Sequence, residues 1–268
     1  MVGKMSQSGR LSARIAVCGT AALLLTCKAS AAGCEASGAT QVEIARITDE
    51  LDLVLKDDRS IRLVGLKALA RPDSAAQPDA RLLAWIREAA GDAPVTLHVL
   101  SPIADRWGRL AGDVFVEGRH LQSTLVQAGL AVARPDDLRG PCWEAVKAAE
   151  SQARRANKGL WADRSSILPA TDGSKIAERE GLFVLASGRV RHVSRAREGR
   201  GRSYVDFGKR GENALFLSFD SKALTRMEKQ GFKLEQLTDR VILVRGVVLK
   251  GRSPHMVVDD LDAIEFWD

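Results

Sequence analysis

Aromatic residues, cysteines and histidines are scarce in this chain of 268 residues. Aromatic side chains make up 5% of the sequence, with a single tyrosine, and there are four cysteines and four histidines. The histidines have no spacing typical of metal ligands, which argues against a zinc site. No nucleophile motif and no phosphate-binding glycine-rich loop is present, which argues against covalent hydrolases and P-loop enzymes. The histidines are His98, His120, His192 and His255.

Long apolar runs are also missing beyond the N-terminal region, so we expect no membrane span in the mature chain. Residues 1–31 have the order of a secretory signal peptide: basic residues, the apolar run IAVCGTAALLL, and small residues at 29–31. A buried helix is the alternative interpretation. We therefore expect an exported protein, periplasmic or secreted. Loss of this segment removes Lys4, Arg10, Arg14 and Lys28 and no acidic residue, which lowers the formal net charge from +6 to +2.

Cys34 and Cys142 are the two cysteines that remain after such a cleavage. An exported protein meets an oxidising compartment, so we expect a disulfide between them. Two unpaired thiols are one alternative. A lipid on Cys34 is another, because the sequence Ala-Ala-Gly-Cys is a loose match to a lipobox.

The stretch from residue 32 to 162 predicts a first domain with strands, a helix, two more strands and further helices. This is the order of a five-stranded Greek-key OB barrel with added helices, an α+β class that is mainly β. The predicted strands are QVEIARIT, LDLVLK, RSIRLVGL, PVTLHVL and LAGDVFV, and the predicted helices are DARLLAWIREAAG, LQSTLVQAG and CWEAVKAAESQARRANKGLW.

Residues 163–180 are polar and contain a proline and glycines, which is typical of a linker. Residues 181–268 then predict a second, smaller β-rich domain in which a helix separates the third and fourth strands. This order is OB-like, although an unrelated small α+β domain fits the pattern as well. The predicted strands are LFVLASGRVRHVS, RSYVDFG, NALFLSF, RVILVRGVVLK and HMVVDD, and the predicted helix is SKALTRMEKQG.

The stretch DRWGRLAGDVFV, residues 105–116, resembles the second signature of the staphylococcal nuclease (thermonuclease) family. The family has an aspartate, a basic residue, an aromatic residue, glycine and arginine there, followed by a strand. Trp107 stands where the family usually has tyrosine, and Ala111 where it usually has leucine or valine. The resemblance spans roughly residues 41–162. It implies an OB barrel and calcium-dependent hydrolysis of phosphodiesters.

The resemblance also implies which residues would carry the chemistry. In the family two carboxylates hold Ca²⁺, a glutamate is the general base, and two arginines stabilise charge on the phosphoryl oxygens. Arg62 and Arg109 occupy the two arginine positions of the family. The metal and base positions do not match: they are occupied by Leu51 and Lys67 for the metal aspartates, Ala68 for a threonine and Ala70 for the glutamate.

These mismatches predict a catalytically impaired nuclease homologue without a cofactor or metal, because an ammonium beside a divalent ion is strongly repelled. Asp49, Asp52 or Asp73 could instead supply displaced carboxylates, which would make the protein a divergent Ca²⁺-dependent phosphodiesterase. A third interpretation is that the two matched arginines only bridge to carboxylates such as Asp105 and Asp113 and stabilise the barrel.

The second domain contains a basic segment around its only tyrosine, which suggests a hairpin that binds single-stranded nucleic acid or another polyanion through phosphate contacts and base stacking. A solvated hairpin without a ligand is the alternative. A structural envelope protein that binds another protein is a further reading of the whole chain, and its oligomeric state is open. The predicted binding residues are Arg189, Arg191, Arg195, Arg197, Arg200, Arg202 and Tyr204.

Overall fold

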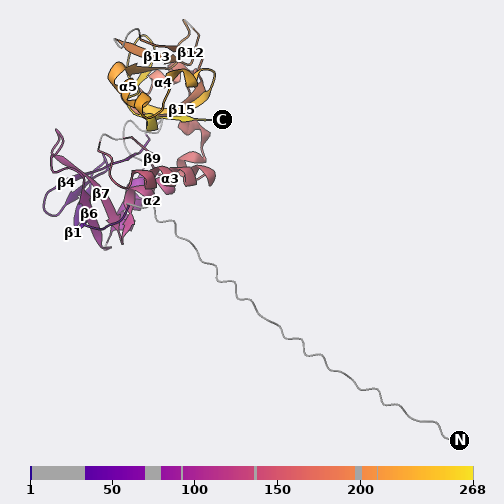
Figure 1. Ribbon diagram of the computed structural model, residues 1–268. Helices are drawn as coiled ribbons and strands as arrows, with labels where there is room; N and C mark the ends of the chain where they lie inside the picture. The colour runs from indigo at the N-terminus through magenta and orange to yellow at the C-terminus, as the bar shows by residue number, and fades with distance from the viewer. Residues whose placement is uncertain are drawn as a thin grey trace. The chain divides into compact units, whose positions relative to one another are not determined.

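The computed structural model describes Met1 and residues 34–69, 80–91, 93–135, 138–196, 201–209 and 211–267 (Figure 1). The expected signal peptide therefore lies almost wholly outside the described residues. We call residues 34–163 the first half of the chain and residues 164–267 the second half.

A mixed, curled β-sheet forms the first half, with the strand order β1-β6-β7-β4-β3-β2 and β8 paired with β7. Strand β4 runs parallel to β7 and antiparallel to β3. A short ribbon of β5 and β9 lies apart from this sheet. The strands are β1 (Thr40–Val42), β2 (Ile44–Ile47), β3 (Asp52–Leu55), β4 (Ser60–Leu63), β5 (Leu66–Lys67), β6 (Val95–Val99), β7 (Arg109–Val116), β8 (Arg119–His120) and β9 (Val132–Ala133).

Three helices cover the core of the first half, as the apolar periodicity predicts. In α1 (Ala80–Ala90) the buried side chains fall on one face, and α3 (Trp143–Arg155) buries the small residues Ala149 and Ala153, which permit close packing against α2 (Leu121–Gln127). Gly129 ends α2 with φ at 70°, and a Cβ there would lie 2.1 Å from the carbonyl oxygen of Lys158. Only glycine fits this turn.

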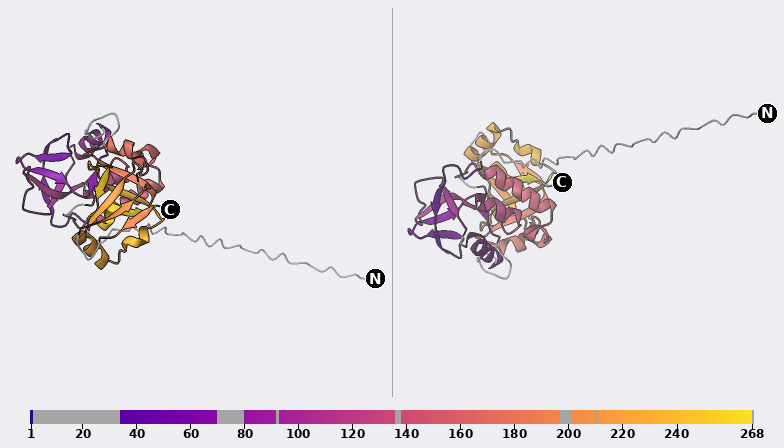
Figure 2. Two further views of the ribbon diagram at one scale, coloured as in Figure 1. Left: turned by 90° about the horizontal axis from the view of Figure 1, so that it is seen from above. Right: turned by 90° about the horizontal axis from the view of Figure 1, so that it is seen from below.

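The second half, coloured from orange to yellow in Figure 2, is β-rich, as predicted. It contains two four-stranded sheets. One has the order β10-β11-β15-β17 and the other β12-β13-β14-β16. The core includes Ala186, Val205, Leu217, Phe219 and Val244. The strands are β10 (Ile167–Pro169), β11 (Phe183–Arg189), β12 (His192–Ser194), β13 (Arg202–Asp206), β14 (Phe216–Asp220), β15 (Val241–Val247), β16 (His255–Val257) and β17 (Ile264–Phe266).

Short helices join these strands. Helix α5 (Ser221–Lys229) begins where the side chain of Asp220 accepts a hydrogen bond from the backbone N–H of Ala223, at 2.8 Å. The other helices are α4 (Gly173–Ala177) and the 3₁₀ turns η1 (Gly159–Trp161), η2 (Arg164–Ser166), η4 (Leu234–Leu237) and η5 (Leu261–Ala263).

The segment 163–180, which we expected to be a linker, contains η2, β10 and α4. Strand β10 pairs in parallel with β11, so this segment belongs to a sheet of the second half. The domain boundaries themselves stay a prediction.

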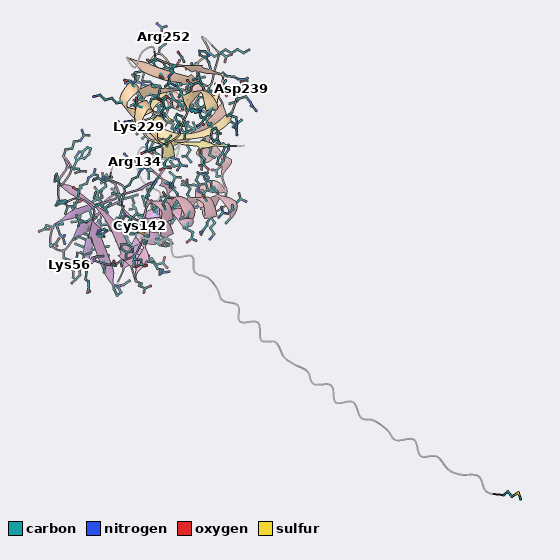
Figure 3. All side chains as sticks on the ribbon, viewed as in Figure 1. Lys56, Arg134, Cys142, Lys229, Asp239 and Arg252 are labelled. Atoms are coloured by element: carbon teal, nitrogen blue, oxygen red, sulfur yellow. A yellow bond between two sulfur atoms is a disulfide. The ribbon has the colours of Figure 1, made fainter. Side chains whose placement is uncertain are left out.

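The expected disulfide is confirmed: Cys34 and Cys142 are joined, and Cys142 stands directly before α3 (Figure 3). Among the helices of the described residues, none has the length and apolar character needed to cross a membrane. The disulfide is compatible with an exported protein.

Candidate functional site

Arg109, at the start of β7, is the centre of a charged group in the first half. Its guanidinium lies 2.8 Å from a carboxylate oxygen of Asp105 and 3.1 Å from one of Asp52. Asp105 belongs to the turn before β7, whereas Asp52 begins β3. The arginine therefore connects two segments that are far apart in sequence.

The turn that contains Asp105 is built by its own carboxylate. One oxygen accepts hydrogen bonds from the backbone N–H groups of Trp107 and Arg109, at 2.9 and 3.0 Å, and the other accepts from the Arg109 side chain. The Arg109 side chain, helped by these backbone donors, lowers the pKa of Asp105 to about 2. Trp107 is 62% exposed, and the guanidinium groups of Arg106 and Arg109 lie over its ring.

Arg62, on β4, shares a face of the sheet with Arg109. The strand register places Arg62 opposite Asp52 and beside Ala111, two residues after Arg109. The alternate residues Leu53, Ile61 and Val114 point into the core. The structure thus brings both predicted arginines to the outer face of neighbouring strands.

The backbone at Leu51 and Asp52 directs an aspartate side chain to Arg109. Leu51 has φ at 71°, in the left-handed region, and its side chain packs in the core. The next residue, Asp52, turns its carboxylate to Arg109 and is only 8% exposed. Burial raises the pKa of Asp52, although Arg109 acts in the opposite direction.

The sequence pattern suggests Asp52 only as a displaced metal ligand and does not predict its pair with Arg109. A signal was available in the hairpin of β3 and β4. Counting outward from the turn at Asp57 and Asp58 pairs Asp52 with Arg62, one strand away from Arg109. The other expected partner of the arginines, Asp113, instead lies 3.3 Å from the Nε2 of His120.

Lys67, on β5, occupies the position that the family resemblance assigns to a metal aspartate. Desolvation of its ammonium, followed by the charges of Arg134 and Arg109, lowers the pKa of Lys67, while Asp52 opposes this effect. The β5-β9 pairing places Lys67 opposite Val132, and the backbone N–H of Arg134 donates to the oxygen of Gly65 at 2.9 Å, so Arg134 directly follows the strand beside Lys67. Ala68 is half-buried against the core, and Ala70 and Asp73 lie outside the described residues.

A calcium ion does not fit this donor set. Calcium needs six to eight oxygen ligands, several of them carboxylates. Here Asp52 and Asp105 are both bonded to Arg109, Lys67 adds a positive charge, and Asp49 is exposed. Within the described ranges, the one close group of three or more acidic, histidine or cysteine ligand atoms is Cys34, His120 and Cys142, and its two sulfur atoms form the disulfide.

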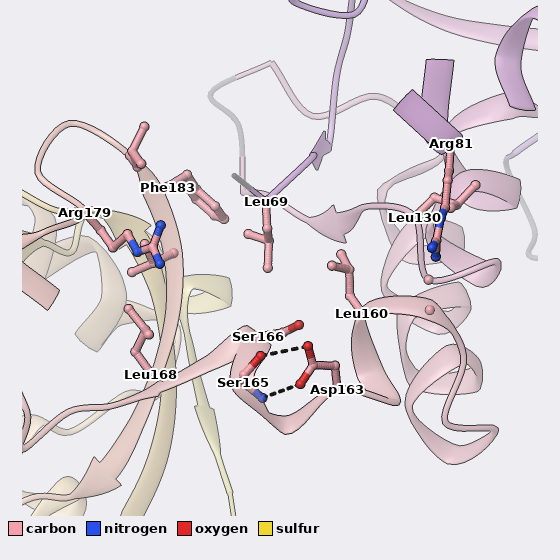
Figure 4. Close-up of a pocket in the computed structure, with 14 residues that line it drawn as sticks. Leu69, Arg81, Leu130, Leu160, Asp163, Ser165, Ser166, Leu168, Arg179 and Phe183 are labelled. Atoms are coloured by element: carbon pink, nitrogen blue, oxygen red, sulfur yellow. Dashed lines mark hydrogen bonds between the residues drawn. The ribbon is translucent and has the colours of Figure 1, made fainter. Parts of the chain in front are cut away.

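Leu69, two residues after Lys67, packs against the second half. It is buried with Val132 of β9, and with Phe183, Leu185 and Leu243 of the second half. A cavity of about 160 Å³ adjoins it (Figure 4). Besides Leu69 and Phe183, its wall includes Arg81, Leu130, Leu160, Asp163, Ser165, Ser166, Leu168 and Arg179. The strand that carries the metal aspartate in the family therefore continues here into an apolar contact.

Among the predicted arginines of the second half that the structure describes, Arg189 and Arg195 are bonded to other residues. Arg189 donates to the backbone oxygen of Asp239, and Arg195 is bonded to Glu228 and Glu235. Arg191, Arg202 and Tyr204 are exposed. Arg197 and Arg200 lie outside the described residues.

Comparison with known proteins agrees with the geometry of the first half. No curated protein matches the chain. Residues 60–163 match the family model described as staphylococcal nuclease homologue. This range includes Arg62, Lys67 and Arg109, whereas Leu51 and Asp52 precede it. On this match, together with the curled mixed sheet, residues 60–163 are similar to the staphylococcal nuclease homologue family.

Proposed function

We propose that this is an exported protein that binds nucleic acid or another polyanion through a nuclease-like domain that has lost hydrolytic activity. The observation that carries the proposal is the group around Lys67. Lys67 stands where the family resemblance requires a metal carboxylate, and it pairs across the β5-β9 ribbon with Val132, two residues before Arg134. Such a site attracts phosphate groups and repels a divalent cation.

Hydrolysis of a phosphodiester needs an activated water as well as charge stabilisation. Arg62 and Arg109 could supply the charge stabilisation, because both lie on the outer face of the sheet. No residue at the matched positions can activate the water, since Lys67, Ala68 and Ala70 replace the acidic and hydroxyl residues. Loss of a general base alone lowers a rate by roughly 10²–10⁴-fold.

Export is supported by the pattern of residues 1–31 and is compatible with the disulfide. An extracellular or periplasmic place is also consistent with a mature chain whose two remaining cysteines are both bonded.

A nuclease assay tests the loss of hydrolysis. Purified protein is incubated with single-stranded DNA and Ca²⁺, with and without chelator, and acid-soluble nucleotides are measured. We expect no chelator-sensitive release. Two variants are compared with the unmodified protein. Lys67→Asp should bind calcium more tightly, as measured by calorimetry, but should not cleave DNA. Lys67→Asp with Ala70→Glu adds a general base beside the ion.

A binding assay tests the second part of the proposal. Labelled single-stranded DNA and polyphosphate are titrated with the protein at low and high salt, and we expect affinity for at least one of them that falls steeply with salt. Absence of both interactions would refute polyanion binding.

A divergent phosphodiesterase is the second candidate function. The observation that favours it is the presence of two carboxylates, from Asp52 and Asp105, beside one arginine. Robust chelator-sensitive cleavage by the unmodified protein would establish this candidate and overturn ours.

A further inference from the structure

One face of the sheet β12-β13-β14-β16 is largely open, although Ser218 on it is buried, and its side chains form cross-strand rows. The register aligns His192, Asp206, Phe216 and His255 in one row. The next row contains Ser194, Tyr204, Ser218 and Val257. The intervening residues of the same strands, such as Val205, Leu217 and Met256, are buried in the core on the other face.

A groove of about 880 Å³ lies on this open face, within the size range of ligand sites. Its wall combines aromatic, basic and acidic side chains. The residues that matter here are Arg191, His192, Tyr204, Asp206, Lys209 and Phe216. Four of these belong to three adjacent strands, so their positions are set by the sheet.

Tyr204 is held in place by its neighbours. Its ring meets the edge of Phe216 at a centroid distance of 6.0 Å, and Phe216 stacks on His255 at 4.9 Å. Even so, Tyr204 remains 38% exposed. A fixed, exposed ring on a sheet is the kind of surface on which nucleic-acid bases stack.

The charges of the groove favour a ligand that has both anionic and hydrogen-bond-donating parts. Arg191 and Lys209 are exposed cations suited to phosphate groups. Asp206 is half-buried, and burial raises its pKa although His192 acts in the opposite direction. A carboxylate in this position repels a phosphate chain but accepts hydrogen bonds from the N–H groups of a base.

From this arrangement we propose that a single-stranded nucleic acid binds in the groove of the second half, with a base stacked on Tyr204, the N–H groups of that base directed to Asp206, and its phosphates beside Arg191 and Lys209. The inference deepens the proposed polyanion binding and rests on it. It selects nucleic acid over a polyanion without bases, because the acidic and aromatic residues of the groove have no role toward the latter.

The test compares two exposed aromatic residues of the second half in the full protein. Anisotropy titrations use labelled single-stranded DNA of mixed sequence, with polyphosphate as a competitor without bases. Tyr204→Ala should weaken DNA binding by about fivefold or more, since stacking on an aromatic ring contributes at least that much per base. Tyr204→Phe should retain most of the affinity. Phe266→Ala, which removes a 44% exposed ring from the other sheet, should leave it unchanged.

Asp206→Asn separates base recognition from charge. Removing a negative charge should strengthen competition by polyphosphate, whereas discrimination among homopolymeric DNA strands should decrease. Retained fold is checked by far-ultraviolet circular dichroism for each variant.

The outcomes are distinguishable from those of the proposed function. If the unmodified protein binds neither DNA nor polyphosphate, polyanion binding itself fails. If it binds DNA and Tyr204→Ala does not weaken that binding, only the proposed groove site is refuted. A loss of DNA affinity in Trp107→Ala would then place the bound DNA on the first half. An equal loss of DNA and polyphosphate affinity in Tyr204→Ala would also contradict base stacking.

Discussion

At the scale of single residues, Arg109 determines how the outer face of the first sheet is held together. It was predictable from the DRWGR motif, as was its place on the same face as Arg62, because strand alternation follows from sequence. Its pairing with Asp52 was only partly predictable. The hairpin of β3 and β4 sets Asp52 opposite Arg62, but the left-handed backbone at Leu51, directly before Asp52, has no signal in the sequence because a leucine does not favour a positive φ.

Replacing Arg109 with methionine should lower the free energy of unfolding by about 1–3 kcal/mol, because the buried carboxylate of Asp52 loses its charged hydrogen-bond donor. The additional change Asp52→Asn should recover part of this loss. Urea unfolding measures both effects. Arg106→Met is the matched control, since Arg106 is exposed, and its midpoint should hardly move. Equal effects of the two single methionine variants would contradict this account of Arg109.

Acid should weaken the fold partly through Asp105. Its pKa in the folded chain, about 2, lies below the value of 3.8 expected for the unfolded chain. The stabilisation is therefore complete above about pH 4 and is lost as the pH falls through 2. Asp52 acts in the opposite sense, because burial raises its pKa. Urea unfolding between pH 5 and 2.5 should show a shallower decline in Asp105→Asn than in the unmodified protein; parallel curves would rule out this linkage.

At the scale of elements, helix α3 and strand β15 are joined by a buried ion pair. Arg245 lies 2.9 Å from a carboxylate oxygen of Glu150 and donates to the backbone oxygen of Ala133 at 2.7 Å. Glu150 also accepts from Arg154 and from the backbone N–H of Ala133. This group therefore links helix α3 and strand β9 of the first half to strand β15 of the second half.

Sequence periodicity predicted these elements but not their connection. Helix α3 and strand β15 follow from apolar spacing, whereas Glu150 and Arg245 are 95 residues apart and pair only in the folded chain. Strands β10 and β17 were missed for a related reason. Each has three residues, too few to show alternation, and β10 includes Pro169.

Arg245→Met should destabilise the protein by about 3 kcal/mol, since Glu150 stays buried with Arg154 as its remaining charged partner. Adding Glu150→Gln should restore part of the stability, and a double-mutant cycle in urea measures the coupling. Lys250→Met provides the control, because Lys250 forms an exposed ion pair with Glu180 and should contribute little. Strict additivity of the Arg245 and Glu150 changes would show that the pair is not coupled.

At the scale of the whole molecule, the two halves are in contact, whereas a linker implies two independent domains. Asp262, near the C-terminal end, accepts hydrogen bonds from the Nε1 of Trp143 at 2.8 Å and from Lys147 at 3.3 Å. The local strand pattern of residues 181–268 predicted a β-rich second part, because strand and turn signals are local. Its attachment to α3 rests on contacts over more than a hundred residues, which no local pattern reveals.

Removal of the disulfide should lower the free energy of unfolding by about 4–5 kcal/mol on the chain-entropy estimate, because the bridge joins residues separated by 108 positions. The measurement is the urea midpoint of a Cys34→Ser, Cys142→Ser variant against the oxidised protein. Reduced unmodified protein should behave like the variant. Identical midpoints in all three samples would show that the bridge does not stabilise the fold.

The position of this bridge also orders events during synthesis of the chain. Cys34 precedes every strand of the first sheet, and Cys142 follows the last of them. A ribosome synthesises the chain from the N-terminus. Cys142 is therefore made after all seven strands of that sheet, and Cys34 cannot bond to it earlier. Closure of the bridge between Cys34 and Cys142 therefore marks a sheet whose strands are all present.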